Sequence, residues 1–74
     1  MTLERIDFYC EVEVKESSRL PQHRNKKGAV LGISEEEGVI YGYSVLIHGM
    51  DHLTFFEKDE IFPTGVVFLR SDFY

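Results

Sequence analysis

The chain contains a single cysteine among its 74 residues, and this scarcity limits how the fold can be held together. Cys10 has no second cysteine with which to form an internal disulfide, and no cluster of cysteines and histidines replaces it with a metal. The hydrophobic core must therefore stabilise the fold alone. A chain without disulfides suits a reducing compartment, so we expect a cytoplasmic protein with no cofactor.

Long apolar runs and an excess of basic charge are also missing. No segment approaches the roughly 20 apolar residues that a membrane helix needs, and residues 1–5 contain no apolar run of the signal-peptide kind. The net charge of −5 repels phosphate backbones, whereas nucleic-acid binders usually present a basic face. We therefore expect a soluble protein that binds neither membranes nor nucleic acids, although a basic protein partner is compatible with its charge.

Motifs that carry chemistry are equally scarce. The pair Gly28 and Gly32 lacks the lysine and the longer loop of a phosphate-binding motif. Cys10 alternates with apolar neighbours, which indicates a buried side chain rather than a nucleophile beside a base. The nearest approach to a metal site is a group around one turn: His48, Asp51 and His52. Zinc needs three or four converging ligands, so we predict neither a metal site nor an enzyme.

What the chain does have is a globular composition, with 43% hydrophobic and 28% charged residues. This length suffices for one domain, spanning 1–74. Alternating and β-branched patterns predict strands at 8–15, 28–34, 39–48, 52–56 and 66–70. Between them we expect a long polar loop at 16–27, an acidic turn at 35–38, turns at 49–51 and 64–65, and one helical or 3-10 turn at 57–62 that Pro63 ends.

Two of these strands carry further detail. In 8–15, alternation places Phe8, Cys10, Val12 and Val14 on the buried face. In 39–48, it places Val39, Tyr41, Tyr43, Val45 and Ile47 on one face. Apolar residues on both faces of 39–48 predict a central strand, bent near Gly42, and glycine inside 28–34 predicts a bulge or a close backbone approach.

Five short strands with a 3-10 turn before the last one favour a small SH3-like barrel, which hides most strand edges. A five-stranded barrel of the oligonucleotide-binding type is the alternative, but no segment is long enough for its usual helix.

Three segments match the middle of many SH3-like modules: the glycine-opened run 28–34, the Tyr43-Ser44-Val45 strand and the acidic turn 56–61. The end of the chain is more specific. Pro63-Thr64-Gly65, followed after four residues by Arg70-Ser71-Asp72-Phe73-Tyr74, is similar to the immunity protein 31 family of bacterial polymorphic toxin systems. The resemblance spans about residues 8–74 and implies a cytosolic antitoxin that neutralises a cognate toxin by binding it.

Acidic residues concentrate in the turns on either side of the long strand: Glu35, Glu36, Glu37, Asp51, Glu57, Asp59 and Glu60. If these turns meet at one end of a barrel, their summed field attracts a basic partner and speeds association. The alternative, which charge distributions generally favour, is a set of solvated turns that keep the protein soluble.

Aromatic residues are numerous for this length, and most must fill the core. Neighbouring residues in a strand point to opposite faces, so Phe55-Phe56 and Phe73-Tyr74 each place one ring outside. We predict Tyr9, Tyr43 and Tyr74 as exposed aromatics that contact a partner, since such side chains are common interface anchors. The basic run 23–27 is either a solvated loop, which the acidic remainder favours, or a contact for an acidic ligand or RNA.

The sequence thus yields an ordered set of hypotheses about function. The first is an immunity protein that occludes a toxin through its acidic turns and exposed tyrosines. The second is a general SH3-like interaction module of a larger assembly. Self-association as a homodimer is compatible with either, because a small core gains stability from a partner.

Overall fold

Five antiparallel strands form one sheet in the computed structural model, which describes residues 6–74. Residues 1–5, for which the sequence predicts no signal peptide, lie outside the described part. The strands are β1 (Cys10–Val14), β2 (Lys27–Glu36), β3 (Val39–Ile47), β4 (Leu53–Glu57) and β5 (Ile61–Val67). Three 3-10 turns accompany them: η1 (Pro21–His23), η2 (Lys58–Glu60) and η3 (Arg70–Asp72). The prediction of a mostly β fold with five strands is confirmed.

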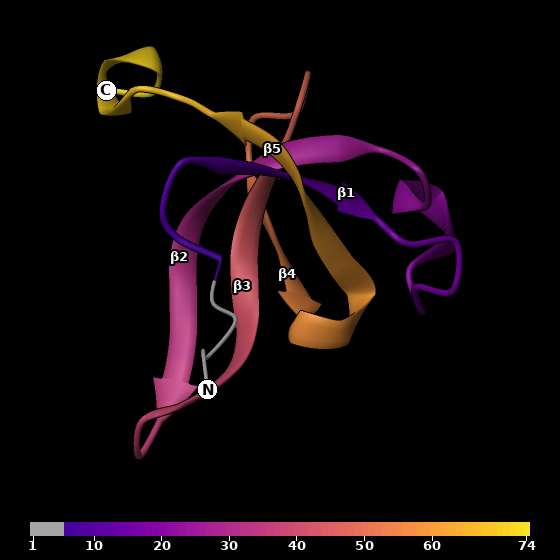
Figure 1. The fold of residues 1–74 in the computed structure, drawn as a ribbon. Coiled ribbons are helices and arrows are strands. Elements are labelled where there is room, and N and C mark those ends of the chain that lie inside the picture. The colour runs from indigo at the N-terminus through magenta and orange to yellow at the C-terminus, as the bar shows by residue number, and fades with distance from the viewer. Residues whose placement is uncertain (1–5) are drawn as a thin grey trace.

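The strand order is β4-β3-β2-β1-β5, so the last strand returns to pair with the first (Figure 1). β3 is an interior strand with a neighbour on each side, as predicted, and β4 and β5 lie at the two ends of the order. The predicted 3-10 turn before the last strand is η2, which connects these two edge strands. Closure of the sheet into a barrel stays a prediction, because β4 and β5 are not neighbours in the strand order. Within residues 6–74, no helical segment has the length and apolar character to cross a membrane.

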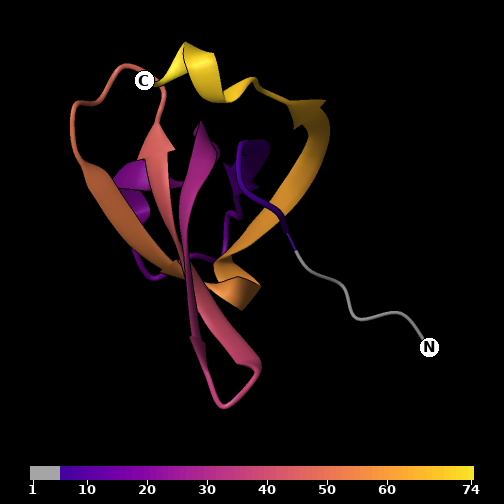
Figure 2. The same cartoon turned by 90° about the vertical axis from the view of Figure 1, so that its left-hand side faces the viewer.

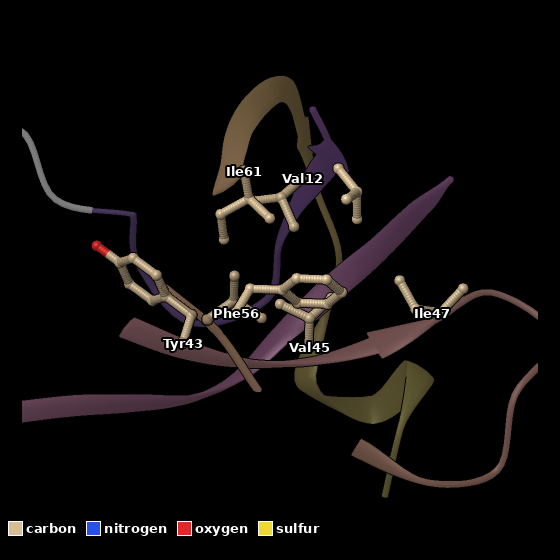
Figure 3. Packing of buried hydrophobic residues seen from close by; sticks show 8 residues of the cluster. Val12, Tyr43, Val45, Ile47, Phe56 and Ile61 are labelled. Carbon is tan, nitrogen blue, oxygen red and sulfur yellow. The ribbon is translucent and has the colours of Figure 1, made fainter. Parts of the chain in front are cut away.

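The core lies on the concave side of this sheet and receives side chains from every strand (Figure 3). Its buried members are Val12, Val14, Val30, Tyr43, Val45, Ile47, Phe56 and Ile61. Alternation places Val12 and Val14 on one face of β1, and Tyr43, Val45 and Ile47 on one face of β3, as the sequence predicts. Phe56 is the largest fully buried side chain. Truncating such a ring to alanine typically costs about 3–5 kcal/mol.

Two register shifts bend β2 and β3. Val30 pairs with Val45 and Gly32 with Ser44, which leaves Leu31 as an extra residue in β2. The predicted bulge in this strand is therefore present. On β3 the extra residue is Tyr41, beside the predicted bend at Gly42. This second shift reverses the alternation, so Ile40 packs against the core whereas Val39 and Tyr41 are exposed. The prediction that Val39 and Tyr41 share one face with Tyr43, Val45 and Ile47 is wrong for this reason.

The start of β1 also differs from the prediction. Tyr9 adopts a φ of 67°, a left-handed conformation that interrupts an extended strand, so β1 begins only at Cys10. Phe8 is consequently exposed rather than buried, and Cys10 is half-buried.

The predicted turn at 64–65 is wrong, since both residues lie inside β5. Val12 pairs with Pro63 and Cys10 with Val67, so three residues of β5 face Glu11 alone. Gly65 has a φ of 97° within this bulge, which explains a glycine that looked like a turn signal. β5 therefore starts earlier than the predicted strand at 66–70 and ends at Val67. Residues 70–72 form η3 instead.

Candidate partner-binding surface

The β2–β3 hairpin projects from the rest of the molecule and ends in three glutamates (Figure 2). Glu35 and Glu36 pair with Ile40 and Val39 as the last residues of β2, and Glu37-Gly38 form the loop. Both loop residues have positive φ, 53° and 79°, as in the type I′ turns that suit twisted hairpins. All three glutamates are exposed. The tip therefore presents concentrated negative charge on a narrow, regular support.

An exposed aromatic pair lies at the base of this hairpin. The bulge turns Tyr41 outward, where its ring lies 6.2 Å from the ring of Phe55 on β4. A Cβ atom at Gly42 would lie 2.2 Å from the Phe55 ring, so only glycine lets this ring lie on the strand. Tyr41 is 52% exposed and Phe55 38%. This pair is absent from the residues predicted from the sequence, although the glycine next to Tyr41 was the signal for it.

The predicted acidic turns do not all meet at one end. β4 ends where Glu57 pairs with Gly42, so η2 lies towards the hairpin tip (Figure 2). Asp51 belongs to the connection after β3, at the opposite end of that strand, where it contacts His52 at 3.2 Å. Asp59 is exposed on η2. The hairpin and η2 thus form one acidic end, and Asp51 is not part of it.

Glu60 is a structural residue rather than an exposed contact. Its carboxylate is buried and accepts hydrogen bonds from the Ser18 hydroxyl at 2.7 Å and from the backbone amides of Arg19 at 3.0 Å and Glu57 at 2.8 Å. Burial disfavours the charged form, but the bonds from Ser18 and the two amides outweigh it, so the pKa of Glu60 lies below its ordinary value. The prediction that Glu60 meets a partner conflicts with this burial.

The neighbouring glutamate is partly neutralised. The Arg19 Nε atom lies 3.1 Å from the Glu57 carboxylate and 3.3 Å from that of Glu60. Glu57 remains exposed, but its net contribution to the acidic end is smaller than that of the hairpin glutamates.

The three predicted tyrosines have different environments. Tyr43 is only 3% exposed, and its hydroxyl accepts a hydrogen bond from the Ile6 amide at 3.2 Å, so the prediction of surface exposure is wrong. Its position in regular alternation with Val45 is the reason. Tyr9 is half-buried, with its ring stacked on Phe73 at 5.9 Å. Tyr74 is exposed.

The basic segment 23–27 is held by the fold at its first residues. His23 is buried and meets the Phe56 ring edge-on at 5.8 Å. The Asn25 amide donates to the Val14 carbonyl, and the Val14 amide donates to the Lys26 carbonyl, both at 2.8 Å. Only the remaining side chains of the segment, including Lys26 and Lys27, are exposed. The prediction that segment 23–27 is a solvated loop is therefore wrong for His23.

A polar group on the outer face of β1 also escaped the sequence analysis. The Glu11 carboxylate lies 2.9 Å from His48 Nε2 and accepts a hydrogen bond from the Thr64 hydroxyl at 2.7 Å. These two contacts lower the pKa of Glu11. His48 thus turns towards Glu11 rather than Asp51 and His52. Across residues 6–74, no three histidine, cysteine or acidic side chains are grouped so that they could hold a metal ion.

Comparison with known proteins adds no relative: no family model, no curated protein and no solved structure matches the chain.

Proposed function

We propose that this protein binds a basic surface of another protein through its hairpin end, acting in the cytoplasm as the immunity protein of a toxin. The observation that carries the proposal is the projecting β2–β3 hairpin, with exposed glutamates at its tip and an exposed tyrosine–phenylalanine pair at its base. Charge at a protruding tip steers an oppositely charged partner during encounter, and exposed aromatic rings supply contact area.

The hairpin suits this role mechanically as well. Its tight turn and paired strands hold the charges in place before binding, so little conformational entropy is lost on association. The Phe55 ring lies on Gly42, which fixes the ring that Tyr41 contacts. Side chains held in this way lose less rotamer freedom when a partner covers them.

The antitoxin form of the proposal rests on the resemblance of 63–74 to immunity protein 31. A general interaction module is the alternative, because a projecting acidic hairpin serves any basic partner equally well. The two differ in what the partner does. An antitoxin suppresses a harmful activity of the protein that it binds, whereas a module links its partner to a larger assembly.

A pull-down from the source cell with tagged protein, at low and at moderate salt, tests the proposal. We expect one stoichiometric partner with a basic surface, whose yield falls as salt rises, because screening weakens exposed charge contacts. Co-expression with the captured partner then separates the alternatives: growth restored by this chain supports an antitoxin, and unchanged growth supports a module. A partner retained equally at all salt concentrations contradicts the acidic hairpin as its site.

A matched pair of double variants identifies the surface. Glu35→Gln with Glu37→Gln removes two charges at the tip, and Glu16→Gln with Asp51→Asn removes two exposed charges elsewhere. The tip variant should slow association several-fold and reduce its salt dependence, while the control keeps both near the original values. Equal effects of the two variants would show that only net charge matters.

The aromatic pair has its own test. Tyr41→Ala should speed dissociation and weaken binding by about 2 kcal/mol if Tyr41 is a central contact. Met50→Ala, which truncates an exposed apolar side chain in the connection after β3, is the control and should leave partner affinity unchanged.

A further inference from the structure

The last part of β5 and the residues after it are unusually apolar for a surface. Val66, Val67 and Leu69 are 46%, 68% and 70% exposed. The end of β5 and the segment after it lie at the end of the molecule opposite the hairpin tip (Figure 2). From Ile61 to Leu69 the sequence contains no charged residue, although 28% of the chain is charged. A protein kept soluble by charge thus leaves one uncharged strand end uncovered within residues 6–74.

This strand is also an edge of the sheet. β5 pairs with β1 on one side and ends the strand order on the other. Proteins commonly protect edges with proline, bulges or charge. The first half of β5 has Pro63 and the bulge at 64–66, but Val67 has none of these devices.

The backbone at Val67 is oriented to pair outward. The Phe68 amide donates to the Tyr9 carbonyl at 2.8 Å, so this amide points towards β1. Successive amides of a strand point to opposite sides, which directs the Val67 amide to the open edge. The next amide on that side, at Leu69, already donates a hydrogen bond to the Asp72 carboxylate at 2.9 Å. The pairing site is therefore short and centred on Val67.

We propose that this edge binds a second copy of the same chain, with Val67 on a two-fold axis. Antiparallel pairing about such an axis is self-complementary, because each Val67 amide donates to the Val67 carbonyl of the other copy. Val66 then lies opposite Phe68, and Gly65 opposite Leu69. The contact buries apolar side chains from both copies and brings no two like charges together across the paired segment.

Charge distinguishes β5 from the other edge strand. The other edge strand, β4, ends in Glu57 and is flanked by Asp51 and Asp59, so pairing two copies along it brings acidic side chains close together, and like charges facing each other are destabilising. The acidic hairpin end is still less suited to meet its own copy. A foreign basic partner fits that end, whereas the uncharged β5 edge fits an identical strand.

Contacts between aromatic rings hold the end of β5 and the residues after it in place. Phe68 meets His48 edge-on at 5.6 Å and Phe73 at 5.7 Å, and Phe73 stacks on Tyr9. These contacts hold the segment after β5 against the outer face of the sheet. The edge therefore needs little rearrangement on pairing, which lowers the entropic cost of association.

Charged variants at the axis test the proposal by sedimentation velocity over a wide range of protein concentration. The unmodified protein should be in a monomer–dimer equilibrium that persists at high salt. Val67→Lys alone and Val67→Glu alone should both be monomeric, since each places two like charges at the axis. An equimolar mixture of the two should recover the dimer, because only a two-fold axis at this position brings Lys and Glu together. Circular dichroism verifies that both variants are folded, and Val39→Lys, an exposed valine on the hairpin, is the control that should still dimerise.

Three results would overturn the proposal. The first is an unmodified protein that stays monomeric at every concentration. The second is a Val67→Lys variant that dimerises like the original. The third is a mixture that stays monomeric while both variants are folded, since this outcome places the contact elsewhere. The partner-binding proposal survives each of them, because its variants lie at the hairpin.

Discussion

The two connections that flank β2 differ in length, charge and contact with the core. The connection after β2 is the two-residue loop of Glu37-Gly38, acidic, exposed and held only by its own hairpin. The connection before β2 runs from Lys15 to Lys26, carries basic residues and includes η1. Length alone would suggest that the longer connection is exposed and adaptable. Its contacts instead attach it to the rest of the fold.

The longer connection is attached to the fold at three places. Ser18 donates to the buried Glu60 carboxylate, His23 lies against the Phe56 ring, and Asn25 bonds to the backbone of β1. In the described part of the chain, no buried side-chain nitrogen or oxygen lacks a hydrogen-bond partner. A long connection is therefore an integral part of the domain, and the short one is the part that projects for binding.

The largest expected effect comes from breaking the attachment at Glu60. Glu60→Gln keeps one oxygen acceptor and replaces the other with an NH₂ group, which then faces either the Glu57 amide or the Ser18 hydroxyl and Arg19 amide. We expect unfolding to become easier by about 2–3 kcal/mol, since hydrogen bonds to charged groups are the stronger ones. Urea unfolding should show a lower midpoint with an unchanged slope.

The matched control is Glu36→Gln, the same chemical change at an exposed position on the hairpin. Its effect on unfolding should stay within about 0.5 kcal/mol. Comparable losses for both variants would show that general charge, rather than the buried contacts of the loop, determines stability.

Substitutions in the hairpin turn should change the free energy of unfolding by less than Glu60→Gln does, and one should lower it while another raises it. Gly38 has a φ of 79°, so Gly38→Ala should cost about 1 kcal/mol. Glu37 also has positive φ, and Glu37→Asn should stabilise the fold by a few tenths of a kcal/mol, because asparagine tolerates this conformation better. Thermal unfolding of the two variants measures both signs. A Gly38→Ala variant as stable as the original would mean that the turn adopts another geometry in solution.

Lowering the pH should reproduce part of the stability loss expected for Glu60→Gln, because it protonates the Glu60 carboxylate. Because the folded pKa of Glu60 lies below 4.5, its bonds contribute stability above that value, and this contribution is lost as pH falls through the lower folded pKa. Glu11 acts in the same sense through His48 and Thr64. The stability of the unmodified protein should thus decline below about pH 4.5, and Glu60→Gln should show a shallower decline. Glu11→Gln combined with Glu60→Gln should be shallower again.

Strand pattern and turn residues were enough to predict five strands, the interior place of β3 in the sheet, the bulge in β2 and the 3-10 turn at η2. Alternation is a local property, and it identifies Val12, Val14, Val45 and Ile47 as core residues because each lies in a regular stretch of strand. The sequence gives no count of residues across a pair of strands. The bulges at Tyr41 and at 64–66 depend on that pairing, and they account for the misplaced Tyr41 and for the turn expected at Thr64-Gly65.

The sequence correctly predicted the site residues whose charge keeps them exposed. The prediction was wrong for a charged residue that is buried and hydrogen-bonded inside the protein. The hairpin glutamates are exposed, as their clustering in a turn indicates. Glu60 differs from Glu57 only through the hydroxyl and amides that reach it from a loop about 40 residues earlier in the chain. These long-range bonds bury one member of an acidic turn while its neighbours stay exposed. A local sequence pattern does not predict them.

The smallest expected effect concerns the surface ion pair between Arg19 and Glu57. Its size shows whether this pair or the buried hydrogen bonds to Glu60 hold the long loop in place. Arg19 is half-exposed and lies 3.1 Å from the exposed Glu57 carboxylate. Arg19→Gln, Glu57→Gln and the double variant form a cycle whose coupling energy should be about 0.5 kcal/mol or less at moderate salt, since exposed pairs are weakened by solvent screening. Ser18→Ala, which removes the hydroxyl that bonds to Glu60, should cost more than this coupling. A coupling larger than the cost of Ser18→Ala would show that the ion pair, rather than the buried carboxylate, holds the loop to η2.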